Sequence, residues 1–436
     1  MHRLLGEPEI SRHEPALGRE TIKAMIGRLF DRLRASRESP PYVSIVESLS
    51  AELEAALLAQ LQPAINATGI VVHTNLGRAP LAAEAQAAIA EISRSYSNLE
   101  FDLEGGDRGS RYAHVTGTLK EVTGAQDALV VNNCAAAVLL MLDTFAKGRE
   151  VVVARGELIE IGGGFRLPEV LARSGATLVE VGTTNRVYIK DFEAALSART
   201  ALLLRTHPSN YRLEGFTAGV EARELVALGQ RAGAIVAEDL GSGALFDLAQ
   251  LGLPHERTVR EALADGIGLV TFSGDKVLGG PQAGIVVGRA NLIARLRNNP
   301  LLRALRVDKM TLAALAATLQ LYRDGSYRER VPVVRMLSAS VADLRRRAER
   351  YCAAIPEATA VESDAYVGGG ASPQTRIPSI AMAIVIEKPN TFAAHLRRAK
   401  PPIVARVDGS RVLLDLRTIA PVEDADVIAA LRRHNA

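Results

Sequence analysis

The chain of 436 residues is too long for one simple core, and its length predicts two or three domains. A net charge of +3 excludes a protein that coats nucleic acid, although it allows local anion-binding patches. The two cysteines, Cys134 and Cys352, are too few for a disulfide framework or a metal cluster, so we expect a reducing compartment and no metal.

Hydrophobic residues make up 48% of the chain, so a large core can be buried. We expect no membrane partner, because no apolar run approaches the roughly 18 residues that a membrane span needs. The first residues, MHRLLGEPEISRHE, are too charged for a signal peptide, and we expect a cytoplasmic protein. The chain also begins abruptly, as though a few residues of a first helix were absent.

Residues 1–63 are predicted to form a helical module, since apolar residues recur every three or four positions in 22–37 and 43–61. The SPPY stretch at 39–42 separates the two helices. Residues 1–37 carry eight Lys or Arg against five Asp or Glu. This charge is compatible with a solvated helix pair that packs on the rest of the protein or with a nucleic-acid-binding module.

Residues 64–330 alternate short apolar runs, such as EVVVARG and GLVTFSG, with helical stretches. Several runs are continuously apolar, which is typical of strands buried on both faces of a parallel sheet, so an α/β domain is predicted. A cluster of charges and a proline at about 323–332 marks a boundary. A helix, several strand-like runs and a last helix follow, and they predict a small α+β domain over 331–436.

A candidate phosphate site lies in the stretch DALVVNNCAAAVLLML. Its strand turns through Asn132 and Asn133 into small residues that open an apolar helix. The N-terminus of a helix binds phosphate through free backbone N–H groups, here those of Cys134 and Ala135. The alternative is an ordinary turn in which Asn caps the helix.

Two further candidates lie at strand ends, Asp239 in GAIVAEDLGSGAL and Lys276 in TFSGDKVLGG. They are 37 positions apart, which suits one strand, one crossover and a neighbouring strand. A lysine and a carboxylate at adjacent strand ends suit pyridoxal phosphate (PLP), because the lysine can bind its aldehyde carbon and the acid its pyridine nitrogen. Ser273 would add a hydroxyl to the phosphate. A solvent-exposed lysine and a helix-capping aspartate are the alternatives.

The order of phosphate turn, acid and lysine is that of the aspartate-aminotransferase type, the type I fold of PLP-dependent transferases. Within this order, longer blocks resemble bacterial selenocysteine synthase, L-seryl-tRNA(Sec) selenium transferase, from about residue 64 to the C-terminus. Examples are INATGIVVHTNLGRAPL, RGELIEIGGGFRLPEV, THPSNYRLEGFT, FSGDKVLGGPQAGIVVG and PLLRALRVDKMTLAALAATL.

The resemblance implies that seryl-tRNA(Sec) is converted to selenocysteinyl-tRNA(Sec) through a dehydroalanyl intermediate, with selenophosphate as the selenium donor. Lys276 would form the Schiff base with PLP and then act as general base. Asp239 would pair with the pyridinium, and Asp275 would orient the lysine or take part in proton transfer.

The resemblance also implies an anion site for selenophosphate at Arg78, Arg303 and Arg306, since planar guanidinium groups suit oxyanions. Arg303 and Arg306 are three positions apart and would share one face of a helix. Arg108 and Arg111 would reach a phosphate or a neighbouring subunit. The family forms a homodecamer built from dimers, and the N-terminal helices would bind the tRNA, with no role for DNA.

Two positions depart from the family pattern. Cys134 stands where the family usually has Asn, and Gly164 where it usually has Ser. Backbone donors survive the first change, so we still expect PLP to bind. One alternative function is a related PLP-dependent lyase for a free amino acid or an amino sugar, and another is a non-enzymatic tRNA-binding paralogue. The retained lysine, acid and arginines favour the selenium transferase.

Overall fold

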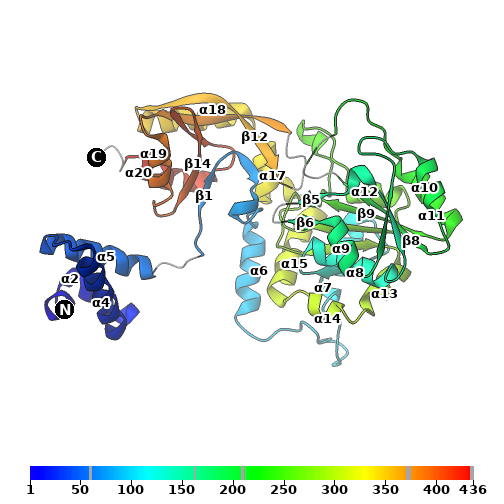
Figure 1. Ribbon diagram of the computed structural model, residues 1–436, viewed down its shortest axis with the longest axis horizontal. Helices are drawn as coiled ribbons and strands as arrows, with labels where there is room; N and C mark the ends of the chain where they lie inside the picture. Colours follow the sequence, from blue (N-terminus) through cyan, green and yellow to red (C-terminus); the bar gives the residue numbers. More distant parts are fainter. Residues whose placement is uncertain (58–60, 162–163, 208–210, 212, 370–374, 433–436) are drawn as a thin grey trace. The chain divides into compact units, whose positions relative to one another are not determined.

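The computed structural model describes the chain except residues 58–60, 162–163, 208–210, 212, 370–374 and 433–436 (Figure 1). The chain divides into two compact units, Met1–Ala64 and Ile65–Ala436, and each has a hydrophobic core of its own. None of the helices in the described ranges is long and apolar enough to cross a membrane.

The first unit is a helical bundle, as predicted. Its helices are α1 (His2–Leu5), α2 (Pro8–Ser11), α3 (Glu14–Leu17), α4 (Arg19–Ser36) and α5 (Tyr42–Leu57). The buried residues of α4 recur with helical spacing: Ile22, Met25, Ile26 and Leu29. They share a core with Leu49 and Leu53 of α5, so the unit is held together by the apolar stripes of its two long helices.

The second unit contains a seven-stranded sheet with the order β3-β11-β10-β9-β8-β4-β7. The strands are β3 (Asp127–Val131), β4 (Glu150–Ala154), β7 (Thr177–Val181), β8 (Thr200–Thr206), β9 (Ile235–Gly241), β10 (Leu269–Ser273) and β11 (Gly284–Gly288). All of these strands are parallel except β11, which runs antiparallel to β10 and β3. The carboxyl ends of the parallel strands therefore meet at one edge, where α/β sheets bind their ligands.

Helices cover both faces of this sheet, which explains why its strands are apolar throughout (Figure 1). Within β3, Ala128 and Val130 belong to one core and Leu129 and Val131 to the other. The first core includes residues of α7 (Ala113–Thr123), α10 (Ile189–Ala195), α11 (Ala222–Ala232), α12 (Val259–Ala264) and α15 (Lys309–Arg323). The second includes residues of α8 (Cys134–Phe145), α9 (Leu167–Arg173), α13 (Ala290–Arg297) and α14 (Leu302–Leu305).

Short elements complete this part of the chain. Helix α6 (Ala83–Ser93) packs against α15, and α16 (Tyr327–Arg330) leads into α17 (Pro332–Ser338). Strands β5 (Glu160–Ile161) and β6 (Phe165–Arg166) form a small hairpin. Gly164 lies in its turn with φ of +83°, a conformation that favours glycine over the serine usual in the resembled family.

A six-stranded sheet, with the order β1-β14-β15-β13-β12-β2, forms the rest of the unit. Its strands are β1 (Ile65–Ala67), β2 (Ile70–Val72), β12 (Ala358–Gly368), β13 (Arg376–Val385), β14 (Ile403–Asp408) and β15 (Arg411–Asp415). Helices α18 (Val341–Ala354), α19 (Pro389–Leu396) and α20 (Asp424–Arg432) pack on it. The domain boundaries predicted from the sequence assigned residues 64–72 to the large α/β domain. The structure instead pairs β1 with β14 and β2 with β12, at the two edges of the C-terminal sheet.

Candidate active site

The candidate acid and the strand that precedes the candidate lysine lie side by side at the centre of the seven-stranded sheet. Asp239 of β9 is the register partner of Thr271 of β10, and the Thr271 hydroxyl donates to Asp239 Oδ1 at 2.9 Å. Because β10 ends two residues later at Ser273, the next loop carries Asp275 and Lys276 past the edge of the sheet. The structure thus brings Asp239 and Lys276 to neighbouring strand ends.

Asp239 is buried, with 6% of its surface exposed, and burial raises the pKa of its carboxyl above the ordinary value. Hydrogen bonds from Cys134 and Thr271, the charge of Lys276 and the N–H of Gly241 act in the opposite direction and favour the ionised form. A cation placed against this carboxylate would favour ionisation further, which is the role of a protonated pyridine nitrogen.

Lys276 is also buried, with 6% of its surface exposed, so the alternative of a solvent-exposed lysine is excluded. Its charge lowers the pKa of the Asp239 carboxyl and of the Cys134 thiol, which places all three groups in one electrostatic environment. The lysine loop is attached to the loop after β9, because Val277 N–H donates to Ser242 O at 3.1 Å. A main-chain hydrogen bond therefore joins the two loops that follow β9 and β10.

The candidate phosphate turn has the predicted form, in which β3 ends at Val131 and α8 begins at Cys134. Asn133 is the N-cap residue, and its side chain accepts a hydrogen bond from Ala136 N–H at 2.8 Å. The capping role, kept open as an alternative, is therefore real for this side chain. It leaves the backbone N–H groups of the first helical turn, at Cys134 and Ala135, as the candidate phosphate donors.

The α8 turn also packs against β11 so closely that a side chain is excluded there. A Cβ atom on Gly284 would lie 1.9 Å from Asn133 O and 2.9 Å from Cys134 N. The glycine of the PQAG block thus allows the start of α8 to approach the sheet. This contact positions the helix N-terminus beside the strand ends that carry the acid and the lysine.

Arg78, one of the three predicted anion ligands, lies at Asp275. Its Nη1 is 2.7 Å from Asp275 Oδ2, and Asp275 is buried, with 7% of its surface exposed. Arg78 is held in the left-handed region with φ of +65°, which is uncommon for a residue with a side chain. The residue that precedes Lys276 thus has Arg78 as its ion-pair partner.

The other two predicted anion ligands, Arg303 and Arg306, line a cavity of about 390 Å³ together with Arg108 and Arg111. The prediction that Arg303 and Arg306 share a helical face is wrong. Helix α14 ends at Leu305, and Arg306 has an extended backbone with ψ of +144°.

The extended conformation of Arg306 has a tertiary cause. Arg306 forms a β-bridge with Val131, and Asn132 N–H donates to Leu305 O at 2.9 Å. These bonds hold the segment against the end of β3, next to the candidate phosphate turn. Glu100 Oε1 lies 3.6 Å from Arg306 Nη1 and also accepts from Arg111, so one carboxylate offsets part of the positive charge of this cavity.

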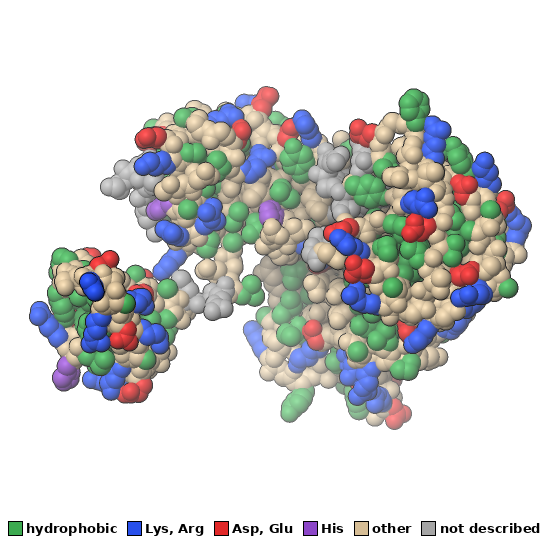
Figure 2. Space-filling view, in the orientation of Figure 1, with side chains coloured by type: hydrophobic (Ala, Val, Ile, Leu, Met, Phe, Trp, Pro, Cys, Tyr) green, Lys and Arg blue, Asp and Glu red, His purple; other side chains and the backbone are tan. Residues whose placement is uncertain are grey.

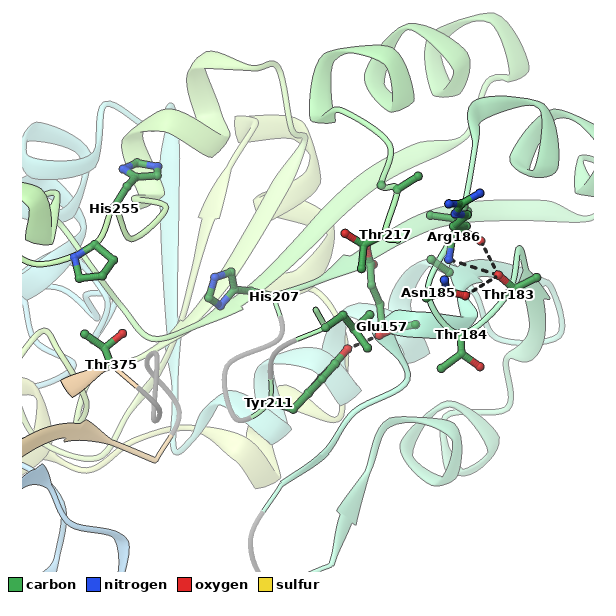
Figure 3. Close-up of a pocket in the computed structure, with 17 residues that line it drawn as sticks. Glu157, Thr183, Thr184, Asn185, Arg186, His207, Tyr211, Thr217, His255 and Thr375 are labelled. Carbon is green, nitrogen blue, oxygen red and sulfur yellow. Dashed lines mark hydrogen bonds between the residues drawn. The ribbon is translucent and has the colours of Figure 1, made fainter. Parts of the chain in front are cut away.

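A second cavity, of about 560 Å³, was not identified from the sequence (Figure 3). Glu157, His207 and Tyr211 are among its lining residues and come from the RGELIEIGGGF and THPSNYRLEGFT blocks, which carry the family resemblance. His207 connects it to the acid, because His207 N–H donates to Asp239 O at 2.9 Å. The cavity therefore adjoins the candidate site along the edge of the sheet.

Glu157 has the most altered acidity in this second cavity. Its carboxylate accepts a hydrogen bond from Thr206 N–H at 2.9 Å, yet burial raises its pKa to about 7. It therefore exchanges a proton near neutral pH, a property suited to a hydrogen-bond donor or a general acid. An acid shortly after a strand was the available sequence signal, since Glu157 lies three residues after the run EVVVA.

The residues present suit PLP. The site combines a buried amine, a buried carboxylate and a helix N-terminus, the three groups that hold its aldehyde carbon, nitrogen and phosphate. Two buried hydroxyls, Ser242 Oγ and Thr206 Oγ1, lack a hydrogen-bond partner within the described residues and are additional candidate contacts. The described part of the chain has no group of three or more His, Cys, Asp or Glu that could hold a metal ion.

Comparison with known proteins agrees with the family resemblance of the sequence blocks. The family model of L-seryl-tRNA selenium transferase matches residues 64–420. L-seryl-tRNA(Sec) selenium transferase of Solidesulfovibrio magneticus is 50% identical over 424 residues, which cover 94% of this chain and 90% of the relative. The enzyme of the same name from Moorella thermoacetica is 52% identical over 382 residues, with coverage of 85% and 81%.

Among solved structures, D-glucosaminate-6-phosphate ammonia-lyase is similar, with a TM-score of 0.61. It is 21% identical, and the match covers 86% of this chain and 95% of that chain, so the likeness concerns the fold alone. The predicted fold class is confirmed: a type I fold of PLP-dependent transferases, with a helical N-terminal region and a mixed α/β body.

Proposed function

Since the chain belongs to the L-seryl-tRNA selenium transferase family, we propose that it converts seryl-tRNA(Sec) to selenocysteinyl-tRNA(Sec) with PLP as cofactor and selenophosphate as donor. The observation that carries the proposal is the position of Asp239 and Lys276, two buried groups of opposite charge at adjacent strand ends. Bound PLP supplies an electron sink for the electron pair that remains when the serine Cα loses its proton.

In this proposal each residue at the sheet edge has its own role in binding the cofactor or in transferring a proton. Asp239 keeps the proton on the pyridine nitrogen, and the first N–H groups of α8, with Ser273, bind the phosphate. Lys276 Nζ would hold the aldehyde carbon of the cofactor and, once its amine is free, would take the proton from the serine Cα. The serine hydroxyl would leave from Cβ as water, and selenium would add at the same carbon. Water would cleave the bond between selenium and phosphorus, which releases inorganic phosphate.

Arg78, Arg303 and Arg306 are proposed to hold selenophosphate, a compact anion with several charges. The support is their chemistry, together with the contact of Arg78 to the residue before Lys276 and the position of Arg306 beside the phosphate turn. Asp275 is proposed to orient Arg78 as well as Lys276, because it forms an ion pair with Arg78 and directly precedes Lys276 in the chain.

The helical unit Met1–Ala64 is proposed to bind the tRNA by contacts to its shape and phosphates. Lys and Arg side chains are present on the visible face of this unit, as Figure 2 shows. We further propose a homo-oligomer, by family resemblance a homodecamer built from dimers, since three large apolar side chains before α7 are exposed: Tyr96, Phe101 and Leu103. We also propose a cytoplasmic location, since the proposed substrate is an aminoacylated tRNA.

The proposal is tested by incubating the full-length protein with PLP, seryl-tRNA(Sec) and selenophosphate and identifying the aminoacyl group by mass spectrometry. Selenocysteine is expected with the native protein and with Lys147→Ala, a change at an exposed lysine that pairs with Asp143. Lys276→Ala should abolish both the product and the visible absorbance of the bound cofactor. Turnover of free serine or an amino sugar acid, with seryl-tRNA(Sec) unchanged, would reject the proposal.

A further inference from the structure

One oxygen of Asp239 accepts hydrogen bonds from two side chains on different elements. Thr271 Oγ1 on β10 donates to Oδ1 at 2.9 Å, and Cys134 Sγ, on the first residue of α8, donates to the same oxygen at 3.2 Å. The proposed functions of the site use the backbone N–H of Cys134 and the carboxylate of Asp239. They assign no role to the thiol or to the Thr271 hydroxyl.

The thiol is a neutral donor at this position. Burial raises the pKa of the Cys134 thiol well above its ordinary value, and the neighbouring Asp239 carboxylate raises it further. The proton therefore stays on sulfur, so the group donates a hydrogen bond and is a poor nucleophile. A hydrogen-bond donor to a carboxylate is consequently the chemistry that this cysteine can supply.

The position of the thiol is set by the start of the helix. Asn133 caps α8 through Ala136 N–H, and Gly284 lets the same turn pack directly on β11. Thr271 is equally fixed, since it lies inside β10 and is fully buried. Both donors therefore approach Asp239 from rigid elements, and together they restrict rotation of its carboxylate.

We propose that Cys134 and Thr271 are positioning residues that occupy Oδ1 of Asp239 and leave Oδ2 to face the pyridine nitrogen of PLP. Cys134 also has a second role, because its backbone N–H lies in the turn proposed to bind the phosphate. One residue then relates the two ends of the cofactor, its phosphate through the main chain and its nitrogen through the thiol and Asp239. This inference rests on the proposed function for the presence of PLP.

The contact itself is tested in the cofactor-free, full-length protein by infrared spectroscopy of the S–H stretch, which other protein groups leave clear. Cys352→Ser leaves Cys134 as the single thiol. We expect an S–H band shifted to lower frequency by the carboxylate, and a return toward the free-thiol frequency in Asp239→Asn. A free-thiol frequency in both proteins would overturn the inference.

The consequence for PLP is tested by solid-state ¹⁵N NMR with cofactor labelled at the pyridine nitrogen. Native protein and the Cys352→Ser control should show a protonated nitrogen. Cys134→Ala should move the signal toward the neutral form and weaken PLP binding about fivefold, the loss typical of one hydrogen bond. Cys134→Ser, which keeps a donor, should restore both properties, and Cys134→Ala with Thr271→Val should exceed either single change.

The two levels of the proposal fail in different ways. If native protein binds no PLP, the proposed function fails, while the infrared experiment still decides whether the thiol donates to Asp239. If native protein binds PLP but Cys134→Ala and Thr271→Val leave the ¹⁵N signal and the affinity unchanged, the positioning role is wrong and the proposed function stands.

Discussion

Arg78 Nη1 lies 2.7 Å from Oδ2 of Asp275, the residue that directly precedes Lys276, although the two partners are 197 positions apart in the chain. The backbone of Arg78 is in the left-handed region, and Asp275 is buried. A strained backbone and a buried carboxylate each cost free energy unless other interactions compensate. The pair therefore combines an arginine with an uncommon backbone conformation and a buried carboxylate that this arginine neutralises, directly before Lys276.

Arg78→Ala is expected to lower both stability and selenium transfer. It leaves a buried carboxylate without this partner, which typically costs about 1–3 kcal/mol and is measured by thermal unfolding. Conversion should fall at least about tenfold, the factor for 1.4 kcal/mol. The control is Arg346→Ala, which removes an exposed pair with Asp343. If the two residues act as a pair, adding Asp275→Asn to Arg78→Ala should cause little further loss, and fully additive losses would contradict this.

Arg303→Ala is expected to affect selenium addition more than loss of water from the seryl group, since the proposed role of this arginine is to hold the donor anion. Single-turnover experiments measure the steps separately, first without and then with selenophosphate. Arg345→Ala, at an exposed pair with Glu362, is the matched control. An equal decrease in both steps would indicate that the arginine only supports the structure.

Glu157→Gln is expected to stabilise the protein at neutral pH. Burial raises the pKa of Glu157 to about 7 from an ordinary value of 4.5. Between these values the folded state keeps a proton that the unfolded state releases, so the native protein loses stability as pH rises through this window. The shift corresponds to about 3 kcal/mol in full by pH 8 and to little below pH 4.5.

Glutamine keeps an acceptor for Thr206 N–H and carries no charge, so it should lack this loss. The advantage of Glu157→Gln in unfolding temperature should therefore grow from pH 5 to pH 8. Glu169→Gln, at an exposed glutamate that pairs with Arg173, should show no such growth. A constant difference across the range would mean that Glu157 is ionised throughout.

Removal of residues 1–63 is expected to weaken binding of tRNA(Sec) at least tenfold while the visible absorbance of bound PLP persists. The deletion leaves the C-terminal sheet intact, because β1 begins at Ile65 and belongs to that sheet. The helical unit has a hydrophobic core of its own. Electrophoretic mobility shift measures tRNA binding, and absorbance titration measures PLP. Unchanged tRNA affinity would remove the proposed role of this unit.

The sequence by itself predicted the buried strands and the long helices, and the order in which the turn, the acid and the lysine occur. Continuous apolar runs such as GLVTF require burial on both faces, and parallel strands bring their carboxyl ends to one edge. The position of Asp239 and Lys276 at neighbouring strand ends, as a candidate site, was therefore predicted from pattern alone. The helical stripes of the first 60 residues were predicted for the same reason, since burial imposes a local period.

Only the tertiary structure decided which side chains meet. The contact of Cys134 with Asp239 spans 105 positions and that of Arg78 with Asp275 spans 197, and both depend on strand order and register. Arg306 was predicted in a helix, but a β-bridge to Val131 holds it extended. Likewise β1 and β2 are three residues each, too short to show a period, and join a sheet whose other strands lie some 290 residues later or more. The local pattern of apolar residues indicates whether a residue is buried. Its contact partners depend on distant segments of the chain, and the packing of those segments cannot be seen in the local sequence.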